Sequence, residues 1–277
     1  MVIKRIFFLI FILLLLINKS LHASRVLDYE TEVFIQKIVS EIKQVNNIKK
    51  DIKFIVVSDR NINAYVDQNN IMYITSGLIE NCEDYVAFLS VVAHEIGHID
   101  KNHVSERKFK KKNYKNINSV SNLSIIAGSM ISRNPDLLQG LAVSSAGVSE
   151  INIKFNKNQE READYYSLNT LKKLNLYSNS IINLLKTIEK KGLQKGLTKS
   201  HIRISSHPYF EERISIIKYL NEKKNISFDK NTNLKFNSVR SKFLGYNLNK
   251  EEINKLKDPF KIYANLIIKA KSGNLKE

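Results

Sequence analysis

The chain has 277 residues, of which 43% are hydrophobic and 26% charged, with 3 Pro and 9 Gly, which is typical of a globular protein with one sizeable core. The single cysteine, Cys82, excludes a fold held by intramolecular disulfides. The formal net charge of +17 comes from lysines spread throughout the chain, not from a basic patch beside stacking aromatics, so we expect no nucleic acid partner.

The N-terminus has the features of an export signal. Two basic residues precede an unbroken apolar run from Ile6 to Ile17, and the small residue Ala23 follows. This order is typical of a secretory signal peptide over residues 1–23 that is cleaved after Ala23. The run is shorter than the roughly 20 residues of a spanning helix, so a retained anchor is the less favoured alternative. We therefore expect a periplasmic or otherwise exported protein.

The elements that follow are predominantly helical. Apolar residues at helical spacing predict a helix from Tyr29 to about Val45, and the β-branched segment DIKFIVVSD predicts a strand. Two extended segments around the turn DQNN come next, and then a helix from about Asp84 to His103. Another helix is expected in NKNQEREADYYSLNTLKKLN, and two or three polar helices from about Asn231. The pattern predicts an α+β fold that is mostly α-helical.

Small apolar segments lie between residues 122 and 147. Each is shorter than a bilayer crossing, so we favour core helices. Peripheral contact with a membrane surface is the alternative, and the basic charge of the chain is compatible with it.

The helix expected to end near His103 carries the motif His-Glu-x-x-His. Residues four apart are only about 40° apart around a helix, so His94 and His98 can present ring nitrogens to one metal ion. Glu95 can take a proton from water without binding the metal itself. The motif also arises by chance in amphipathic helices, so a third ligand is needed to make a metal site.

The third ligand is expected from the segment EREAD. Glu160 and Asp164 are four residues apart on one helical face, so Glu160 can complete the site while Asp164 accepts the imidazole N–H of a ligand histidine. Glu162 is interpreted as a surface charge. His103 has the wrong spacing for a third histidine ligand and is interpreted as a helix-end histidine with a local hydrogen bond.

Four segments in this order carry a family resemblance: NAYVDQNNIMYITSGLI, HEIGH, EREAD and SHPYFEERI. Together they resemble the zinc metallopeptidases of the HtpX and CAAX-protease type, especially the exported BepA-like members. The resemblance implies a zincin-like (gluzincin) domain that binds one Zn²⁺ per chain. It further implies that His94, His98 and Glu160 are the zinc ligands and that Glu95 is the catalytic base.

The resemblance also implies a small β-sheet whose edge strand flanks the active site. Asn63 and Ala64 match the Asn-Ala-aromatic element of the family, just ahead of an expected edge strand over residues 71–75. A substrate peptide would pair with this edge, and Ile71 and Tyr73 would contribute to its binding.

His207 and Arg213 match the His-Pro…Arg element of the family. His207 would act in catalysis by stabilising the oxyanion, or would bind zinc as a fourth ligand and keep the enzyme latent. From the residues alone, a helix-capping or core histidine is the alternative. Arg213 is expected to pair with a buried carboxylate.

The predicted organisation is a signal peptide over 1–23, a metallopeptidase domain over 24–225 and a helical C-terminal extension over 226–277, whose last residues resemble the start of a tetratricopeptide repeat. The predicted function is a zinc endopeptidase in protein quality control, with unfolded or misassembled envelope proteins as substrates. The alternative is a chaperone-like binding factor with slow or no hydrolysis.

Overall fold

The computed structural model describes most of the chain, namely residues 24–106, 158–176, 179–194, 228–273, 196, 214, 215, 217 and 218. The predicted signal peptide, the apolar segments between 122 and 147, and both His207 and Arg213 lie outside the described residues. The described part is mostly helical with one small sheet, which confirms the predicted α+β class. None of its helices is long and apolar enough to cross a bilayer.

Three strands form the sheet: β1 (Lys53–Val57), β2 (Ala64–Val66) and β3 (Ile71–Thr75). β1 pairs parallel with β3, and β2 pairs antiparallel with β3 across the predicted turn. In that turn, the Asp67 side chain accepts the backbone N–H of Asn69 and of Ile71, and Asn70 takes a positive φ of 59°. Asn tolerates this conformation better than most residues, which explains a tight turn without glycine.

The strand order corrects one prediction. The order is β1-β3-β2, so residues 71–75 form the central strand and the prediction that they form the edge is wrong. Because β3 is hydrogen-bonded to a strand on each side, its backbone is committed to the sheet and cannot pair with a substrate. Residues 24–26 run along β1 through a bridge between Arg25 and Val57. In the part of the chain that the structure describes, β2 is therefore the edge strand.

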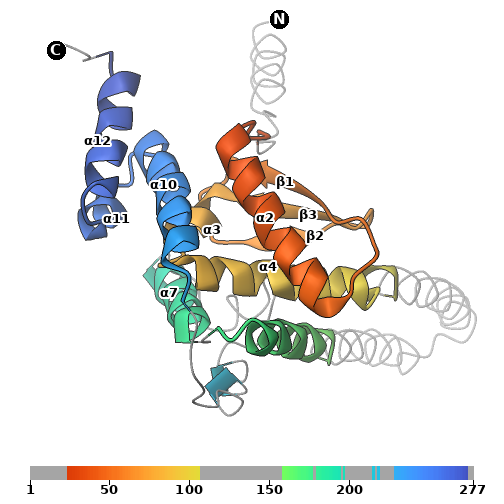
Figure 1. The fold of residues 1–277 in the computed structure, drawn as a ribbon. Coiled ribbons are helices and arrows are strands. Elements are labelled where there is room, and N and C mark those ends of the chain that lie inside the picture. Colours follow the sequence, from red (N-terminus) through yellow and green to blue (C-terminus); the bar gives the residue numbers. More distant parts are fainter. Residues whose placement is uncertain are drawn as a thin grey trace, which may run out of the picture.

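Two long helices pack on the sheet: α2 (Tyr29–Asn46) and α4 (Tyr85–Asp100). Figure 1 shows α2 crossing the sheet while α4 runs below it, and β2 is the strand that contacts α4. The Asp28 side chain caps α2 by accepting the N–H of Thr31. Burial alone would raise the pKa of Asp28, but the hydrogen bonds from Thr31 and Lys242 outweigh it and lower that pKa.

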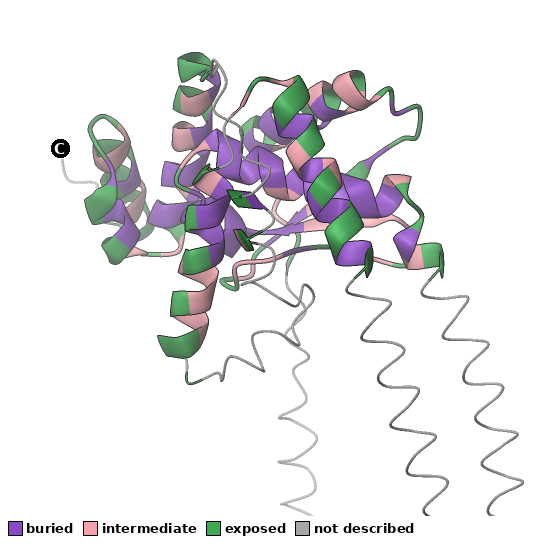
Figure 2. Cartoon of the chain, turned by 90° about the horizontal axis from the view of Figure 1, so that it is seen from below, coloured by how far each residue is buried: buried purple, intermediate pink, exposed green. Residues whose placement is uncertain are grey.

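The hydrophobic core lies between the sheet and these helices, and α10 (Lys230–Tyr246) completes it. Phe34, Phe88 and Phe236 come from α2, α4 and α10, and their ring centroids are 5.7–6.0 Å apart. Figure 2 shows the buried residues gathered on the inward faces of the helices. The segment that α10 begins is thus part of the same core, although the boundary predicted at residue 225 is itself outside the described residues.

The remaining helices surround this core. The helical tail predicted from about Asn231 is observed, and α12 packs along α10. The other labelled helices are α3 (Ser76–Asn81), α7 (Asn179–Gln194), α11 (Lys250–Lys255) and α12 (Phe260–Lys271).

Phe236→Ala tests whether α10 is part of the core. Phe236 is 0% exposed, so we expect a loss of about 3–5 kcal/mol in the free energy of unfolding, measured by urea titration with circular dichroism. Leu234→Ala, at a position of the same helix that is 53% exposed, should cost less than about 0.5 kcal/mol. Equal effects of the two substitutions would contradict the shared core.

Candidate metal centre

Helix α4 carries the two histidines of the His-Glu-x-x-His motif, and its ends are well defined. Asp84 begins the helix by accepting the N–H of Ala87 at 2.8 Å. At the other end, the Lys50 ammonium donates to the carbonyls of Ile99 and Asp100 at 3.2 and 3.0 Å. A cation at a helix C-terminus satisfies carbonyls that have no partner within the helix. These contacts hold the last turns of α4, where His94 and His98 lie.

A second helix, over residues 158–173, packs closely against α4. At Gly97, an added Cβ would lie 3.1 Å from Cβ and Cγ of Tyr166, which is tighter than ordinary van der Waals contact. The glycine inside the motif therefore lets the second helix approach. Ser167 reinforces the contact by donating to the carbonyl of Ser90 at 2.7 Å. Burial, with a smaller contribution from the charge of Asp100, raises the pKa of the Tyr166 hydroxyl, which stays neutral in this contact.

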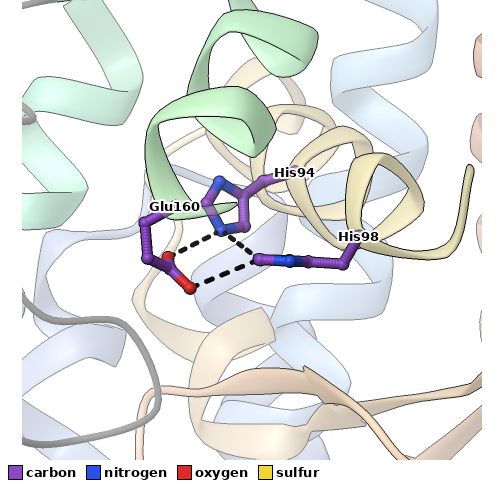
Figure 3. Close-up of side chains that lie close together, drawn as sticks. All are labelled: His94, His98 and Glu160. Carbon is purple, nitrogen blue, oxygen red and sulfur yellow. Dashed lines mark hydrogen bonds and ion pairs between the residues drawn. The ribbon is translucent and has the colours of Figure 1, made fainter. Parts of the chain in front are cut away.

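This packing brings Glu160 to the two histidines (Figure 3). Its two carboxylate oxygens lie 3.3 Å from Nε2 of His94 and 3.4 Å from Nε2 of His98. The two Nε2 atoms are 3.1 Å apart. All three residues are 2% exposed. One nitrogen from each histidine and the carboxylate thus converge on one point from two helices.

The hydrogen bond between His94 and Asp164 indicates which kind of ligand would fit between His94 and Glu160. Nδ1 of His94 lies 2.9 Å from Oδ1 of Asp164, and a carboxylate accepts, so Nδ1 carries the proton. Nε2 of His94 then presents a lone pair towards the Glu160 carboxylate, which is also an acceptor. Two acceptors facing each other in a buried site repel unless a cation lies between them. The arrangement therefore fits a divalent metal ion.

Comparison with known proteins identifies the family. The family model described as Peptidase family M48 matches residues 30–221, which is most of the chain. The chain belongs to peptidase family M48. This confirms the resemblance found in the sequence and makes the fold that of a zincin-like metallopeptidase domain.

Three curated proteins are similar to this chain at low sequence identity. A "Putative beta-barrel assembly-enhancing protease" of Vibrio cholerae serotype O1 is 25% identical over 184 residues, and a "Beta-barrel assembly-enhancing protease" of Yersinia pestis is 22% identical over 174. "Metalloprotease YcaL" of Escherichia coli K12 is 28% identical over 178 residues. Each match covers 63% of this chain, 35% of the first two relatives and 63% of the third. The chain thus spans about a third of the length of the first two.

The structure also places the other residues that are expected from the M48 resemblance and lie within its described part. Glu95 follows His94 in α4 and is buried. Ala64 begins the edge strand β2 and is buried, with Asn63 just before it. Ile71 and Tyr73 lie on the central strand, and Tyr73 stacks on Tyr65 of β2 with ring centroids 5.1 Å apart. The roles of His207 and Arg213 stay predictions.

The sequence interpretation missed the contact of His103 with the site. Nδ1 of His103 lies 3.0 Å from Nδ1 of His98, and its Nε2 lies 2.9 Å from Oε2 of Glu162. Five residues of helix would not bring His103 back to His98, but the chain turns at Asn102, whose φ is 57°. The one signal in the sequence was an Asn just before a histidine at a helix end, where left-handed conformation is common.

Glu160→Gln should greatly weaken metal binding, because the amide keeps the size of the side chain but loses its charge and its anionic ligand oxygen. We expect about one metal ion per chain in the parent protein by mass spectrometry. In Glu160→Gln the metal affinity should fall by more than the ~10–100-fold that is typical when a residue hydrogen-bonded to a metal ligand is removed. Asn169→Ala, exposed on the same helix, should leave metal content unchanged. Metal retained at the parent level in Glu160→Gln would exclude this carboxylate as a ligand.

Proposed function

We propose that this protein is an exported zinc endopeptidase that hydrolyses peptide bonds of unfolded or misassembled envelope proteins. The observation that supports it most directly is the buried convergence of His94, His98 and Glu160 beside Glu95 in a chain of peptidase family M48. Two imidazoles and one glutamate are a ligand set of catalytic zinc sites, where a fourth position stays open.

The distances between the ligand atoms are compatible with zinc. Tetrahedral coordination with bonds of about 2.0–2.1 Å places ligand atoms roughly 3.3 Å from one another. The two Nε2 atoms are 3.1 Å apart, Oε2 of Glu160 lies 3.3 Å from Nε2 of His94, and Oε1 of Glu160 lies 3.4 Å from Nε2 of His98. His94, His98 and Glu160 are therefore the residues that would hold the ion.

The chemistry divides between the ion and Glu95. When bound, zinc would supply a Lewis acid that activates water and polarises the scissile carbonyl. Glu95 would accept the proton of the attacking water at its carboxylate and deliver it to the departing amine nitrogen. Because the Glu95 side chain is buried, bulk water competes little for this proton.

We propose β2, the edge strand, as the strand to which a substrate peptide adds, in place of β3. Hydrogen bonds join Thr75 N–H to the Asn63 carbonyl and Asp67 N–H to the Ile71 carbonyl. In an antiparallel ladder the backbone groups alternate in direction, so those of Val66 point away from β3. An extended peptide that pairs on this side would lie next to α4, which β2 contacts.

The substrate class and location rest on two further observations. Two relatives are named for enhancing β-barrel assembly, which is a process of envelope proteins, although the chain spans only about a third of their length. The predicted signal peptide over residues 1–23 supports export of this chain. A protein must be locally extended to pair with a strand, which favours unfolded or misassembled substrates over folded ones.

Glu95→Gln should bind zinc as the parent does but lose hydrolysis by at least about a hundredfold, because an amide cannot accept the proton of water. The readouts are metal content by mass spectrometry and the rate at which unfolded casein is cleaved. Glu83→Gln, the same substitution at an exposed position ahead of α4, should keep the parent rate. Equal cleavage by Glu95→Gln and the parent would contradict the mechanism, and full activity of this variant in cells would favour the binding-factor alternative.

Val66→Pro tests pairing with β2. Proline removes an N–H that points away from β3, a position where edge strands tolerate it, so folding should persist. We expect kcat/KM for peptide cleavage to fall about 2- to 10-fold, which corresponds to one lost hydrogen bond. Val66→Ala is the matched control, because it shortens the side chain and keeps the N–H. Identical kinetics of the two variants would argue against strand addition at this residue.

A further inference from the structure

His103 and Glu162 form a hydrogen-bonded chain that leads away from His98. His103 is 1% exposed, whereas the Glu162 side chain is 60% exposed. This series of hydrogen bonds therefore runs from the buried centre to the surface. The three residues come from three places: α4, the short helical segment over residues 103–106, and the helix over residues 158–173. None of these contacts follows from the metal motif alone.

The positions of the hydrogen atoms in this series of hydrogen bonds can be deduced by starting from Glu162. The Glu162 carboxylate only accepts, so Nε2 of His103 donates to it. A neutral His103 then has its lone pair on Nδ1 and accepts the N–H of His98 Nδ1. His98 is thereby left with a lone pair on Nε2, the atom that faces His94 and Glu160. The tautomer that a metal ligand needs is thus the one that His103 and Glu162 favour.

The backbone around His103 is also held in place. Gln159, the neighbour of Glu160, donates its side-chain amide to the carbonyl of His103 at 3.1 Å. Lys50 donates to Oδ1 of Asn102 at 3.1 Å in the preceding turn. A ring anchored through its own backbone can direct its partner ring, so His103 is placed to orient His98 and not merely to fill space.

We propose that His103, supported by Glu162, is a positioning residue that orients the His98 imidazole and sets its tautomer for metal binding. This inference rests on the proposed zinc site. The two ligand histidines are then held differently: His94 by the buried carboxylate of Asp164, and His98 by a neutral ring whose carboxylate partner lies at the surface. Residues that hydrogen-bond to a metal ligand, without binding the metal themselves, typically contribute about 10- to 100-fold in metal affinity.

His103→Leu tests the inference, because leucine fills a similar space without a hydrogen-bond acceptor. We expect zinc affinity, measured by competition with a chromogenic chelator, to fall about 10- to 100-fold. His103→Asn is the matched rescue, since its side-chain oxygen takes the place of Nδ1, and its loss should stay below about threefold. In the cobalt-substituted proteins, the visible absorption bands should shift in His103→Leu and stay close to those of the parent in His103→Asn.

Glu162→Ala provides a second test at an exposed position where folding is not at risk. It should weaken zinc binding in the same direction by about 3- to 10-fold, because water replaces the carboxylate only in part. Parent-like affinity in both His103→Leu and Glu162→Ala would overturn the inference, as would a loss in His103→Asn equal to that in His103→Leu. Failure of the parent protein to bind zinc would instead overturn the proposed function.

Discussion

The close contact of two helices at Gly97 is the constraint on which the metal centre depends. The two histidines lie on α4, but the third ligand, Glu160, is carried by a helix from a distant part of the sequence. A Cβ at residue 97 would lie 3.1 Å from Cβ and Cγ of Tyr166, so any larger residue would require the two helices to shift by a few tenths of an ångström. Ligand atoms must meet within a few tenths of an ångström, so a wider helix spacing would leave two histidines without their carboxylate.

Hydrogen bonds orient both ligand histidines of the centre. Each ligand histidine donates its Nδ1 proton to a defined partner, Asp164 in one case and His103 in the other, so both Nε2 atoms present lone pairs to the same point. Such pre-orientation lowers the entropic cost of coordination, because the rings do not have to be ordered by the metal itself. The aromatic contacts of α2, α4 and α10 support this arrangement, since Phe88 of α4 packs against Phe34 and Phe236 in the core.

The sheet shows where prediction from sequence reached its limit. The strands and their turn were predictable, because β-branched segments and the segment DQNN are local signals. The order of the strands was not, because parallel pairing of β1 with β3 depends on a crossover that leaves no local pattern. Residues 71–75 are apolar enough for either place in the sheet. The difference matters for function, since only an edge strand has backbone groups directed away from its neighbour.

The sequence by itself determined the helices around residues 29–45 and 84–103, the ligand histidines four residues apart and the helix that carries Glu160 and Asp164 four residues apart. These features depend on helical periodicity, which acts within a turn or two of chain. Only the tertiary structure decided that β2 is the edge strand, that α10 contributes Phe236 to the core, and that His103 contacts His98. Each of these depends on contacts between distant segments or on a turn in left-handed conformation, and the packing of the whole molecule selects such contacts among many that the local sequence allows.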